Sequence, residues 1–366
     1  MTGVQELLDR AQREIDEGHL PSCQIAFARN GEVVFETTLG DATNDSRYVL
    51  FSTTKAIVVS GVWILLGEGA LDPNARVADY IPEFATNGKD VITVEQVMLH
   101  TSGFPHAPFL ATEWDDHARR LERFSTWRCN WAPGTRFEYH PTSAHWVLAE
   151  LIERTSGTDF RTFLRSRVLD PLGLPRLQVG VPEAEQGNIA ELVCTGEPVS
   201  PDELAAIGIK ALPVTEVTAK ALMTFNRPEV RAVGVPGGGG VAGARDIVRF
   251  YQALLDDRVG IWKPEVLVDA TSVVRNRLPG YLGEAANRSR GLIIAGDDGD
   301  SNKRGMGHTV SPRAFGHNGA GGQIAWADPE TGMSFCFLTN GLDQHQLREW
   351  RRTAGIASRA GLVREF

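Results

Sequence analysis

Ser52 and Lys55 stand three residues apart in "VLFSTTKAIVVSGVWILL", the stretch from Val49 to Leu66. Residues i and i+3 of a helix lie on one face, so the hydroxyl and the amine can come within hydrogen-bond distance. A serine is a poor nucleophile without a base, and a lysine is a base only when its pKa falls well below about 10.4. Burial in the apolar run after Lys55 would lower that pKa, because burial disfavours the ammonium form. The pair is therefore predicted to be an activated nucleophile and its base.

A helix cap is the competing interpretation of the same stretch. Ser52, Thr53 and Thr54 are all acceptable N-cap residues, and Lys55 could extend along the surface to reach water. S-x-x-K is a short pattern that also occurs by chance in unrelated sequences, so it is weak evidence by itself. Other motifs must decide between the two interpretations.

Two further motifs follow in order along the chain. Tyr139 ends "APGTRFEY" just before an expected helix, and His317-Asn318-Gly319 stands in "FGHNGAGGQIAWADP" just before an expected strand. Penicillin-recognising serine enzymes have three motifs in this order: S-x-x-K, a tyrosine motif, and [K/H]-x-G. With "VEQVMLHTSGF" and "PGGGGVAGARDIVRF", the chain resembles over nearly its whole length the serine β-lactamase-like family, in the branch of class C β-lactamases, D,D-peptidases and family VIII carboxylesterases.

The resemblance implies a role for each motif residue. Ser52 would be the acylated nucleophile, and Lys55 and Tyr139 would share the proton transfers. The backbone N–H groups of Ser52 and Ala320 would form the oxyanion hole, which needs two donors aimed at the developing charge. No metal ion or organic cofactor is implied.

The third motif is implied to bind the substrate. His317, Asn318 and Gly319 would line the edge of a sheet beside the nucleophile, and the glycine would let the substrate lie close to that strand. His100 in "LHTSG" is expected to be structural, because a site of serine, lysine and tyrosine does not need it. The glycines at 237–240 are not followed by G-K-[S/T], so they predict a tight connection and not a phosphate loop.

Two departures from the family pattern bear on the substrate. The tyrosine motif of β-lactamases and peptidases is usually Y-x-N, whereas this chain has Pro141 in place of the asparagine that helps to hold the substrate amide. Their third motif usually begins with a lysine, whereas His317 is largely neutral near pH 7. Both departures predict weak recognition of the β-lactam amide and carboxylate, and favour esters.

Aromatic residues are concentrated between the first two motifs. They could form an apolar acyl pocket, or they could pack the interior of a helical subdomain, and the sequence leaves both open. The residues are Phe104, Phe109, Trp114, Phe124, Trp127 and Trp131.

The elements that position these motifs follow from hydrophobic periodicity. A helix is expected at 1–20, then a hairpin around Asn30-Gly31, because that dipeptide supplies the positive φ of a two-residue turn. Helical spacing dominates from about Ser52 to Met223, and "SAHWVLAELIERTSG" is typical of a helix closed by glycine. A second hairpin near the end and a terminal helix from about Gln344 complete the pattern.

The predicted fold is therefore α+β and β-lactamase/transpeptidase-like. One antiparallel sheet is completed by both ends of the chain and flanked by helices. The expected subdomains are a sheet part, 1–50 and 235–366, and a mainly helical part, 51–234, with the active site between them.

Composition limits the partners. The chain has 366 residues and a net charge of −9 with no basic block, which argues against nucleic acid or an anionic membrane as partner. The apolar run at 49–66 is interrupted and predicts no membrane span. The N-terminus lacks the basic and unbroken apolar regions of a signal peptide, so a cytoplasmic protein is expected. The four cysteines have no metal-ligand spacing and are expected to be reduced and mostly buried.

The function predicted from the sequence is hydrolysis of a small carboxylic ester through an acyl-enzyme on Ser52. A β-lactamase, a D-amino-acid peptidase acting on an amide, or an acyltransferase of the same fold are the alternatives among enzymes. A non-catalytic acyl-binding or sensor protein is the alternative from another class. Loss of Ser52, Lys55 or Tyr139 would indicate that class, and all three residues are present.

Overall fold

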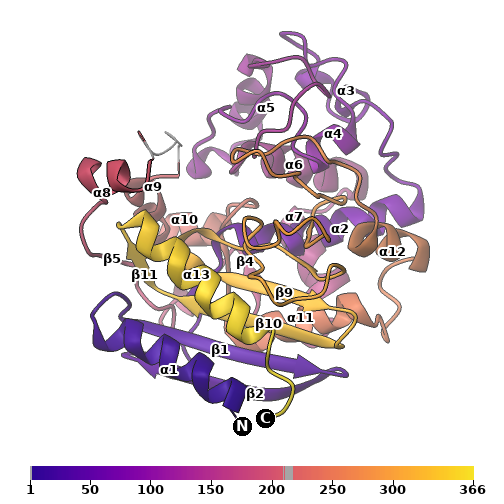
Figure 1. Ribbon diagram of the computed structural model, residues 1–366. Helices are drawn as coiled ribbons and strands as arrows, with labels where there is room; N and C mark the ends of the chain where they lie inside the picture. Colours follow the sequence, from indigo (N-terminus) through magenta and orange to yellow (C-terminus); the bar gives the residue numbers. More distant parts are fainter. Residues whose placement is uncertain (1, 209, 211–216) are drawn as a thin grey trace.

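The computed structural model describes residues 2–208, 210 and 217–366 and is built around a six-stranded antiparallel sheet (Figure 1). The strand order is β2-β1-β10-β9-β8-β7. The strands are β1 (Ser22–Arg29), β2 (Glu32–Gly40), β7 (Ile293–Ile294), β8 (Phe315–Gly316), β9 (Ile324–Asp328) and β10 (Met333–Thr339). Ile25 of β1 pairs with Phe337 of β10, so the two ends of the chain meet at the centre of the sheet, as the sequence predicts.

Both predicted hairpins are present. Asn30 and Gly31 have φ values of 55° and 85°, and they form the two-residue turn between β1 and β2. Positive φ at both positions matches the right-handed twist of the strands, which explains why this dipeptide is a strong signal. The second hairpin joins β9 to β10 in antiparallel register.

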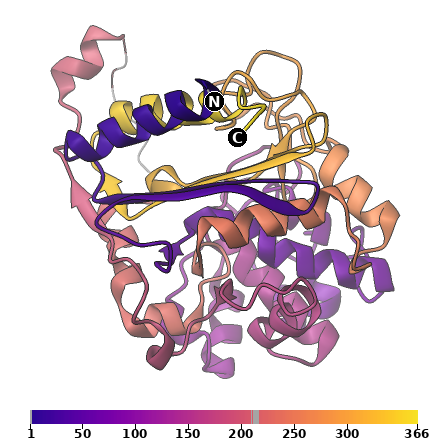
Figure 2. The same cartoon turned by 90° about the horizontal axis from the view of Figure 1, so that it is seen from below.

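Helices cover both faces of the sheet (Figures 1 and 2). Helices α1 (Thr2–Asp16) and α13 (Gln346–Ala360) lie side by side on one face, and α11 (Ala244–Leu255) lies on the other. Strand β1 alternates between the two cores: Ile25 and Phe27 face α1 and α13, while Ala26 and Ala28 face the core that includes α11. Because successive side chains of a strand point to opposite faces of the sheet, alternate residues of β1 contribute to the two cores.

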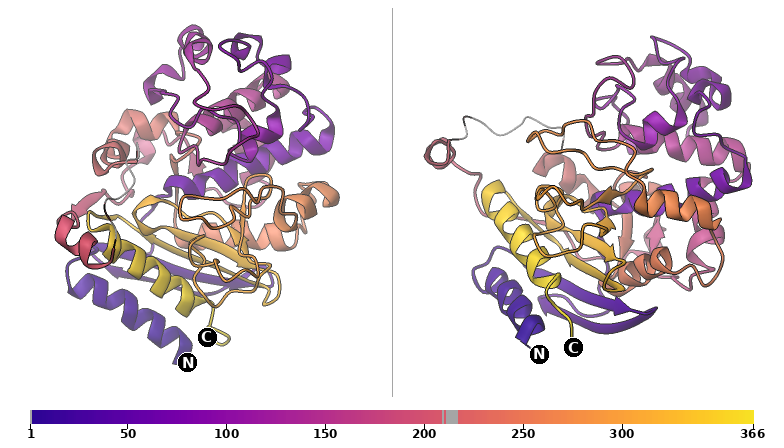
Figure 3. Two further views of the ribbon diagram at one scale, coloured as in Figure 1. Left: turned by 45° about the horizontal axis from the view of Figure 1, so that its top comes forward. Right: turned by 45° about the vertical axis from the view of Figure 1, so that its right-hand side comes forward.

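The other helices form the rest of the molecule, and α3 to α6 among them cluster at one end, away from the sheet (Figures 1 and 3). They are α2 (Thr54–Glu68), α3 (Val77–Tyr80), α4 (Val94–Met98), α5 (His117–Thr126), α6 (Ser143–Ser156), α7 (Phe160–Leu164), α8 (Pro201–Ala206), α9 (Ala219–Met223), α10 (Pro228–Val233) and α12 (Pro264–Ser272). Helix α6 ends at Gly157 with φ 67°, as its sequence predicts.

Two small sheets contain the other strands of the described residues. One has the order β3 (Tyr48–Val49), β6 (Gly240–Ala242) and β4 (Gln178–Val179), and the other pairs β5 (Val193–Thr195) with β11 (Gly341–Asp343). The three-stranded sheet fixes the position of the chain segment that leads into α2, because Tyr48 of that segment pairs with Ala242.

Helix α2 is the central helix of the interior. Over the described residues, only the segment Phe51–Glu68 has the length and mean hydropathy of a membrane-span candidate, and 78% of it is buried inside the protein. Such burial on all sides is the property of a core helix. The four cysteines are free, but only Cys23 and Cys336 are buried, which is fewer than predicted.

We propose that the chain divides as its sequence indicates, into a sheet subdomain of residues 1–50 and 235–366 and a mainly helical subdomain of residues 51–234. The clustering of α3 to α6 away from the sheet supports this division. Residues 209 and 211–216 of the helical part lie outside the described residues.

Candidate active site

Ser52 lies in a turn that projects it from the start of the central helix. A single 3-10 turn, Phe51–Thr53, precedes α2, and Ser52 is partly exposed between the buried residues Phe51 and Thr53. Phe51 has φ 45°, in the left-handed region that a bulky residue rarely adopts. Such strain is held in place by the packing of the Phe51 ring and is common at functional sites.

Lys55 is fully buried, and three oxygen atoms surround its amine. Its Nζ lies 3.1 Å from Ser52 Oγ, 2.6 Å from the carbonyl oxygen of Pro141 and 2.6 Å from that of Gly237. Carbonyl oxygens only accept hydrogen bonds, so the amine donates one N–H to each of them, and it donates a third to Ser52 Oγ. Loss of the proton that faces Ser52 Oγ would leave the nitrogen lone pair directed at that oxygen, as a general base requires.

Gly237 is a site residue that the sequence interpretation missed. The glycine stretch at 237–240 is the tight connection predicted, but it also supplies a carbonyl to Lys55 across 182 residues of chain. A Cβ atom at Gly237 would lie 2.9 Å from the Pro141 carbonyl oxygen and 3.5 Å from Lys55 Nζ. Only glycine therefore allows this backbone to approach the lysine so closely.

Tyr139 completes the predicted trio. Its ring centre lies 5.1 Å from Lys55 Nζ. Burial raises the pKa of its phenol to about 12, while Arg288 and the hydroxyl of Ser52 act in the opposite direction. Tyr139 is consequently a neutral phenol near pH 7, close to Ser52 and Lys55.

The third motif lies in the connection between β8 and β9, next to the nucleophile turn. A Cβ atom at Gly319 would lie 2.4 Å from the carbonyl oxygen of Leu50, two residues before Ser52. Ala320 follows directly, so its backbone is placed beside the turn that carries the serine. The side chain of Asn318 accepts from Ala325 N at 3.2 Å and donates to the carbonyl oxygen of Gly305, so it holds the loop in place.

His317 is a neutral imidazole of known orientation. Its Nδ1 lies 2.8 Å from the carbonyl oxygen of Asn318, which can only accept, so Nδ1 carries the hydrogen and Nε2 carries the lone pair. Burial, together with the charges of Arg288 and Lys55, lowers its pKa well below the ordinary value. The neutral histidine expected at this position is therefore present.

Arg288 is the second residue that the sequence interpretation missed. Its Nη1 lies 3.5 Å from His317 Nε2, and its guanidinium lies 5.2 Å from the centre of the Tyr139 ring. The side chain is buried, burial lowers its pKa to about 10, and its Nε has no hydrogen-bond partner among the described residues. A guanidinium from a distant loop therefore lies beside the third motif, whose own histidine is neutral.

Three more histidines surround Tyr139 and are also held neutral. His100 packs on the Tyr139 ring, and its Nδ1 accepts a hydrogen bond of 3.1 Å from the backbone N–H of His140. Burial is the main cause that lowers the pKa of His140 to about 3 and those of His100 and His145 well below the ordinary value. His100 has φ 57° and holds the backbone of the tyrosine motif, a structural role as expected.

These four buried histidines predict a steep loss of stability in acid. In the unfolded chain they bind protons below about pH 6.5, whereas in the folded chain they do not, so stability is full above pH 6.5 and falls as the pH drops toward the folded pKa values. Each histidine should cost about 1.5 kcal/mol of the free energy of unfolding between pH 6.5 and pH 5. Urea denaturation at several pH values measures this slope, and His145→Leu should reduce it whereas His308→Leu, an exposed position, should not. An equal slope in the His145 variant would contradict the assignment.

The aromatic residues between the first two motifs pack the helical part. Phe104, Trp114, Phe124 and Trp127 are buried in one core with Trp146. The cleft beside Tyr139 has a volume of about 810 Å³, and none of the six candidate aromatic residues lines it. The packing interpretation, and not the acyl pocket, therefore accounts for them.

Other residues form the walls of that cleft. Tyr139, Pro141 and Arg288 line it together with eight apolar residues and six charged or ionisable ones. The apolar lining residues are Phe137, Val217, Pro279, Tyr281, Leu282, Ala286, Ile293 and Trp350. They come from segments far apart in the sequence, so local patterns could not identify them.

Known proteins share both the sequence and the architecture. The sequence model of the family described as Beta-lactamase matches residues 7–358. The esterase/β-lactamase LipL of Mycobacterium tuberculosis is 28% identical over 322 residues, which are 81% of this chain and 70% of that protein. A penicillin-binding protein homologue from Caulobacter crescentus superposes with a TM-score of 0.77 at 27% identity, covering 98% of this chain and 96% of the other. A family VIII carboxylesterase superposes with a TM-score of 0.76 at 25% identity, covering 98% and 97%. The predicted β-lactamase/transpeptidase-like fold is confirmed.

Proposed function

Because this chain belongs to the Beta-lactamase family and is a serine hydrolase, we propose that it cleaves carboxylic esters through an acyl-enzyme on Ser52. One observation carries the proposal. The buried Lys55 amine lies within hydrogen-bond distance of the carbonyl oxygens of Pro141 and Gly237, and its third neighbour is Ser52 Oγ. A helix cap with a solvated lysine would not bury this amine.

The reaction that we propose proceeds in two halves. Lys55 accepts the proton of Ser52, and Oγ forms a bond to the ester carbonyl carbon while the carbonyl π electrons move to oxygen. The backbone N–H groups of Ser52 and Ala320 stabilise that oxyanion. When the tetrahedral intermediate collapses, the C–O bond to the alcohol breaks and Tyr139 returns a proton to the leaving oxygen, receiving one from Lys55. Water then repeats the sequence on the acyl-enzyme and releases the acid.

An ester is the preferred substrate class because of the groups around the leaving atom. Pro141 has no side-chain hydrogen bond to offer a substrate amide, and its carbonyl oxygen is already bonded to Lys55. The cleft beyond it is mainly apolar, and its rim includes Tyr281 and Leu282, which are 72% and 59% exposed. Exposed apolar side chains around a cleft favour a ligand with apolar groups.

A β-lactamase or peptidase is the second candidate, and Arg288 is the observation that favours it. A buried guanidinium that lines the cleft without a carboxylate partner among the described residues suits a substrate that carries its own carboxylate. β-Lactams and peptides with a free C-terminus have such a group.

Steady-state kinetics on the purified protein should separate the two candidates. We expect kcat/KM for p-nitrophenyl butyrate to exceed that for penicillins and a chromogenic cephalosporin by at least about a hundredfold, because an activated ester leaves easily whereas a lactam needs firm positioning. A β-lactam value equal to or above the ester value would overturn the esterase proposal in favour of the second candidate.

Arg288→Gln provides the matched test of carboxylate recognition. Comparing p-nitrophenyl butyrate with the mono-p-nitrophenyl ester of succinic acid isolates one carboxylate on similar substrates. Loss of a charge-assisted hydrogen bond should lower kcat/KM for the succinate ester about tenfold or more relative to the butyrate. An equal loss on both esters would show that Arg288 acts through the Tyr139 ring and not on the substrate.

A further inference from the structure

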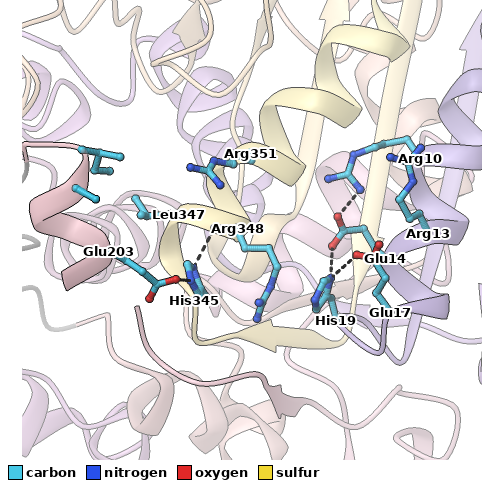
Figure 4. Close-up of a pocket in the computed structure, with 12 residues that line it drawn as sticks. Arg10, Arg13, Glu14, Glu17, His19, Glu203, His345, Leu347, Arg348 and Arg351 are labelled. Carbon is cyan, nitrogen blue, oxygen red and sulfur yellow. Dashed lines mark hydrogen bonds and ion pairs between the residues drawn. The ribbon is translucent and has the colours of Figure 1, made fainter. Parts of the chain in front are cut away.

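A second, strongly charged hollow lies where α8 meets α1 and α13 (Figure 4). Its volume is about 520 Å³. Four arginines, two histidines and three glutamates line it, so it is rich in cations on a chain whose net charge is −9. The lining charged residues are Arg10, Arg13, Glu14, Glu17, His19, Glu203, His345, Arg348 and Arg351.

Glu14 and Arg348, which line the hollow, belong to a network of buried charges. Arg352 Nη1 lies 3.3 Å from Glu14 Oε2 and 3.1 Å from Asp343 Oδ2, and all three side chains are almost fully buried. Arg348 also pairs with Asp343, at 2.7 Å. This network ties α1 to α13, so side chains carried by the two helices are held in a fixed relative position.

Two of the three glutamates of the hollow have close partners, whereas Glu17 is about half exposed and lies 3.4 Å from His19. Glu14 forms ion pairs with Arg10 and Arg352. Glu203 pairs with His345 at 3.1 Å and accepts hydrogen bonds from the backbone and hydroxyl of Ser200. A paired carboxylate repels an incoming anion much less than a bare one.

Two of the arginines that line the hollow have no partner in the described part of the chain. Among the described residues, Arg13 of α1 and Arg351 of α13 make no ion pair and no side-chain hydrogen bond. Figure 4 shows Arg348 and Arg351 on the α13 side and Arg10 and Arg13 on the α1 side. Two guanidinium groups across a hollow can each offer a fork of N–H donors to a different oxyanion group of one ligand.

We propose that this hollow binds a compact multivalent oxyanion through Arg13 and Arg351, with Arg10 and Arg348 also among its lining residues. The ligand chemistry is two or more oxyanion groups on a small molecule, as in a diphosphate or a polycarboxylate. Phosphate and carboxylate oxygens have the same geometric match to guanidinium, so the two sources are distinguished by the probes.

Isothermal titration calorimetry on the full-length protein tests the site directly, with inorganic pyrophosphate and citrate as probes and acetate at matched ionic strength as the reference. We expect saturable one-to-one binding of at least one of the two probes and none of acetate. Binding should weaken as NaCl is raised, because an exposed ion pair is screened by salt. Preference for pyrophosphate or for citrate identifies the source of the oxyanion.

Variants assign the binding to this hollow. The double change Arg13→Gln/Arg351→Gln should weaken binding about tenfold or more, since each arginine provides a charge-assisted hydrogen bond. Arg313→Gln, an exposed arginine outside the hollow, should leave the Kd unchanged, and Glu17→Gln should lower it by removing a negative charge. The changed arginines are unpaired surface residues, so thermal unfolding should match the parent protein. Absence of saturable binding for both probes, or an equal Kd in the double variant, would overturn the proposal.

Discussion

Ser52→Ala is expected to abolish covalent labelling by a fluorophosphonate probe and to lower kcat/KM for p-nitrophenyl butyrate by about 10⁴-fold or more. The residual activity would come from substrate binding and the oxyanion hole, neither of which can replace the bond to Oγ. Peptide mass spectrometry of the labelled parent protein should place the adduct on Ser52. This is the largest effect that we expect, because the change removes the atom to which the acyl group is attached.

A matched control is available in the same helix. Ser60 lies two turns further along α2, is fully buried, and donates its hydroxyl to the carbonyl oxygen of Ile57. Ser60→Ala should keep both labelling and activity. Label on a serine other than Ser52, or full activity in Ser52→Ala, would refute the assignment of the nucleophile.

Lys55→Met and Tyr139→Phe should each lower kcat by at least about 10²-fold, the usual contribution of general acid–base catalysis. Methionine keeps the volume of the lysine chain but removes the amine that faces Ser52 Oγ. Phenylalanine keeps the ring that packs against His100 and Arg288 but removes the hydroxyl. Fluorophosphonate labelling should slow in both variants and still occur at Ser52.

The double variant decides whether the two residues form one proton path. If the proton passes from Ser52 through Lys55 to Tyr139 and the leaving group, the first change already breaks the path, and the second adds little. We therefore expect the combined loss to be clearly smaller than the product of the single losses. Strictly multiplicative losses would show that Lys55 and Tyr139 act independently.

Local structure could be predicted because its causes lie close together in the sequence. Asn30 and Gly31 form the hairpin turn since positive φ is a property of those two residues. The S-x-x-K spacing brings Lys55 Nζ to 3.1 Å from Ser52 Oγ through one turn of chain, and no distant residue has to be known. The sheet formed by both chain ends also follows from local periodicity, once strands are recognised at the two termini.

The functional state of the site depends on long-range contacts that no local pattern records. Lys55 is held by the backbone carbonyl oxygens of Pro141 and Gly237, which lie 86 and 182 residues away in the chain. Every residue has a backbone carbonyl group, so the residue type at these positions does not reveal the contact. Arg288 reaches His317 from a loop 29 residues earlier, and one arginine among many has no distinguishing spacing.

The sequence by itself determined the architecture, which the structure confirms, and it predicted the nucleophile, its base and the tyrosine, because helix and strand periods and short motif spacings carry these signals directly. Only the tertiary structure decided which groups surround them: the cation beside His317, the apolar walls of the cleft, the burial of the aromatic cluster between the motifs, and the arginine-lined hollow between α1 and α13. The physical reason is that burial and charge pairing depend on which distant segments pack together. Packing of that kind is a property of the whole chain and not of any stretch within it.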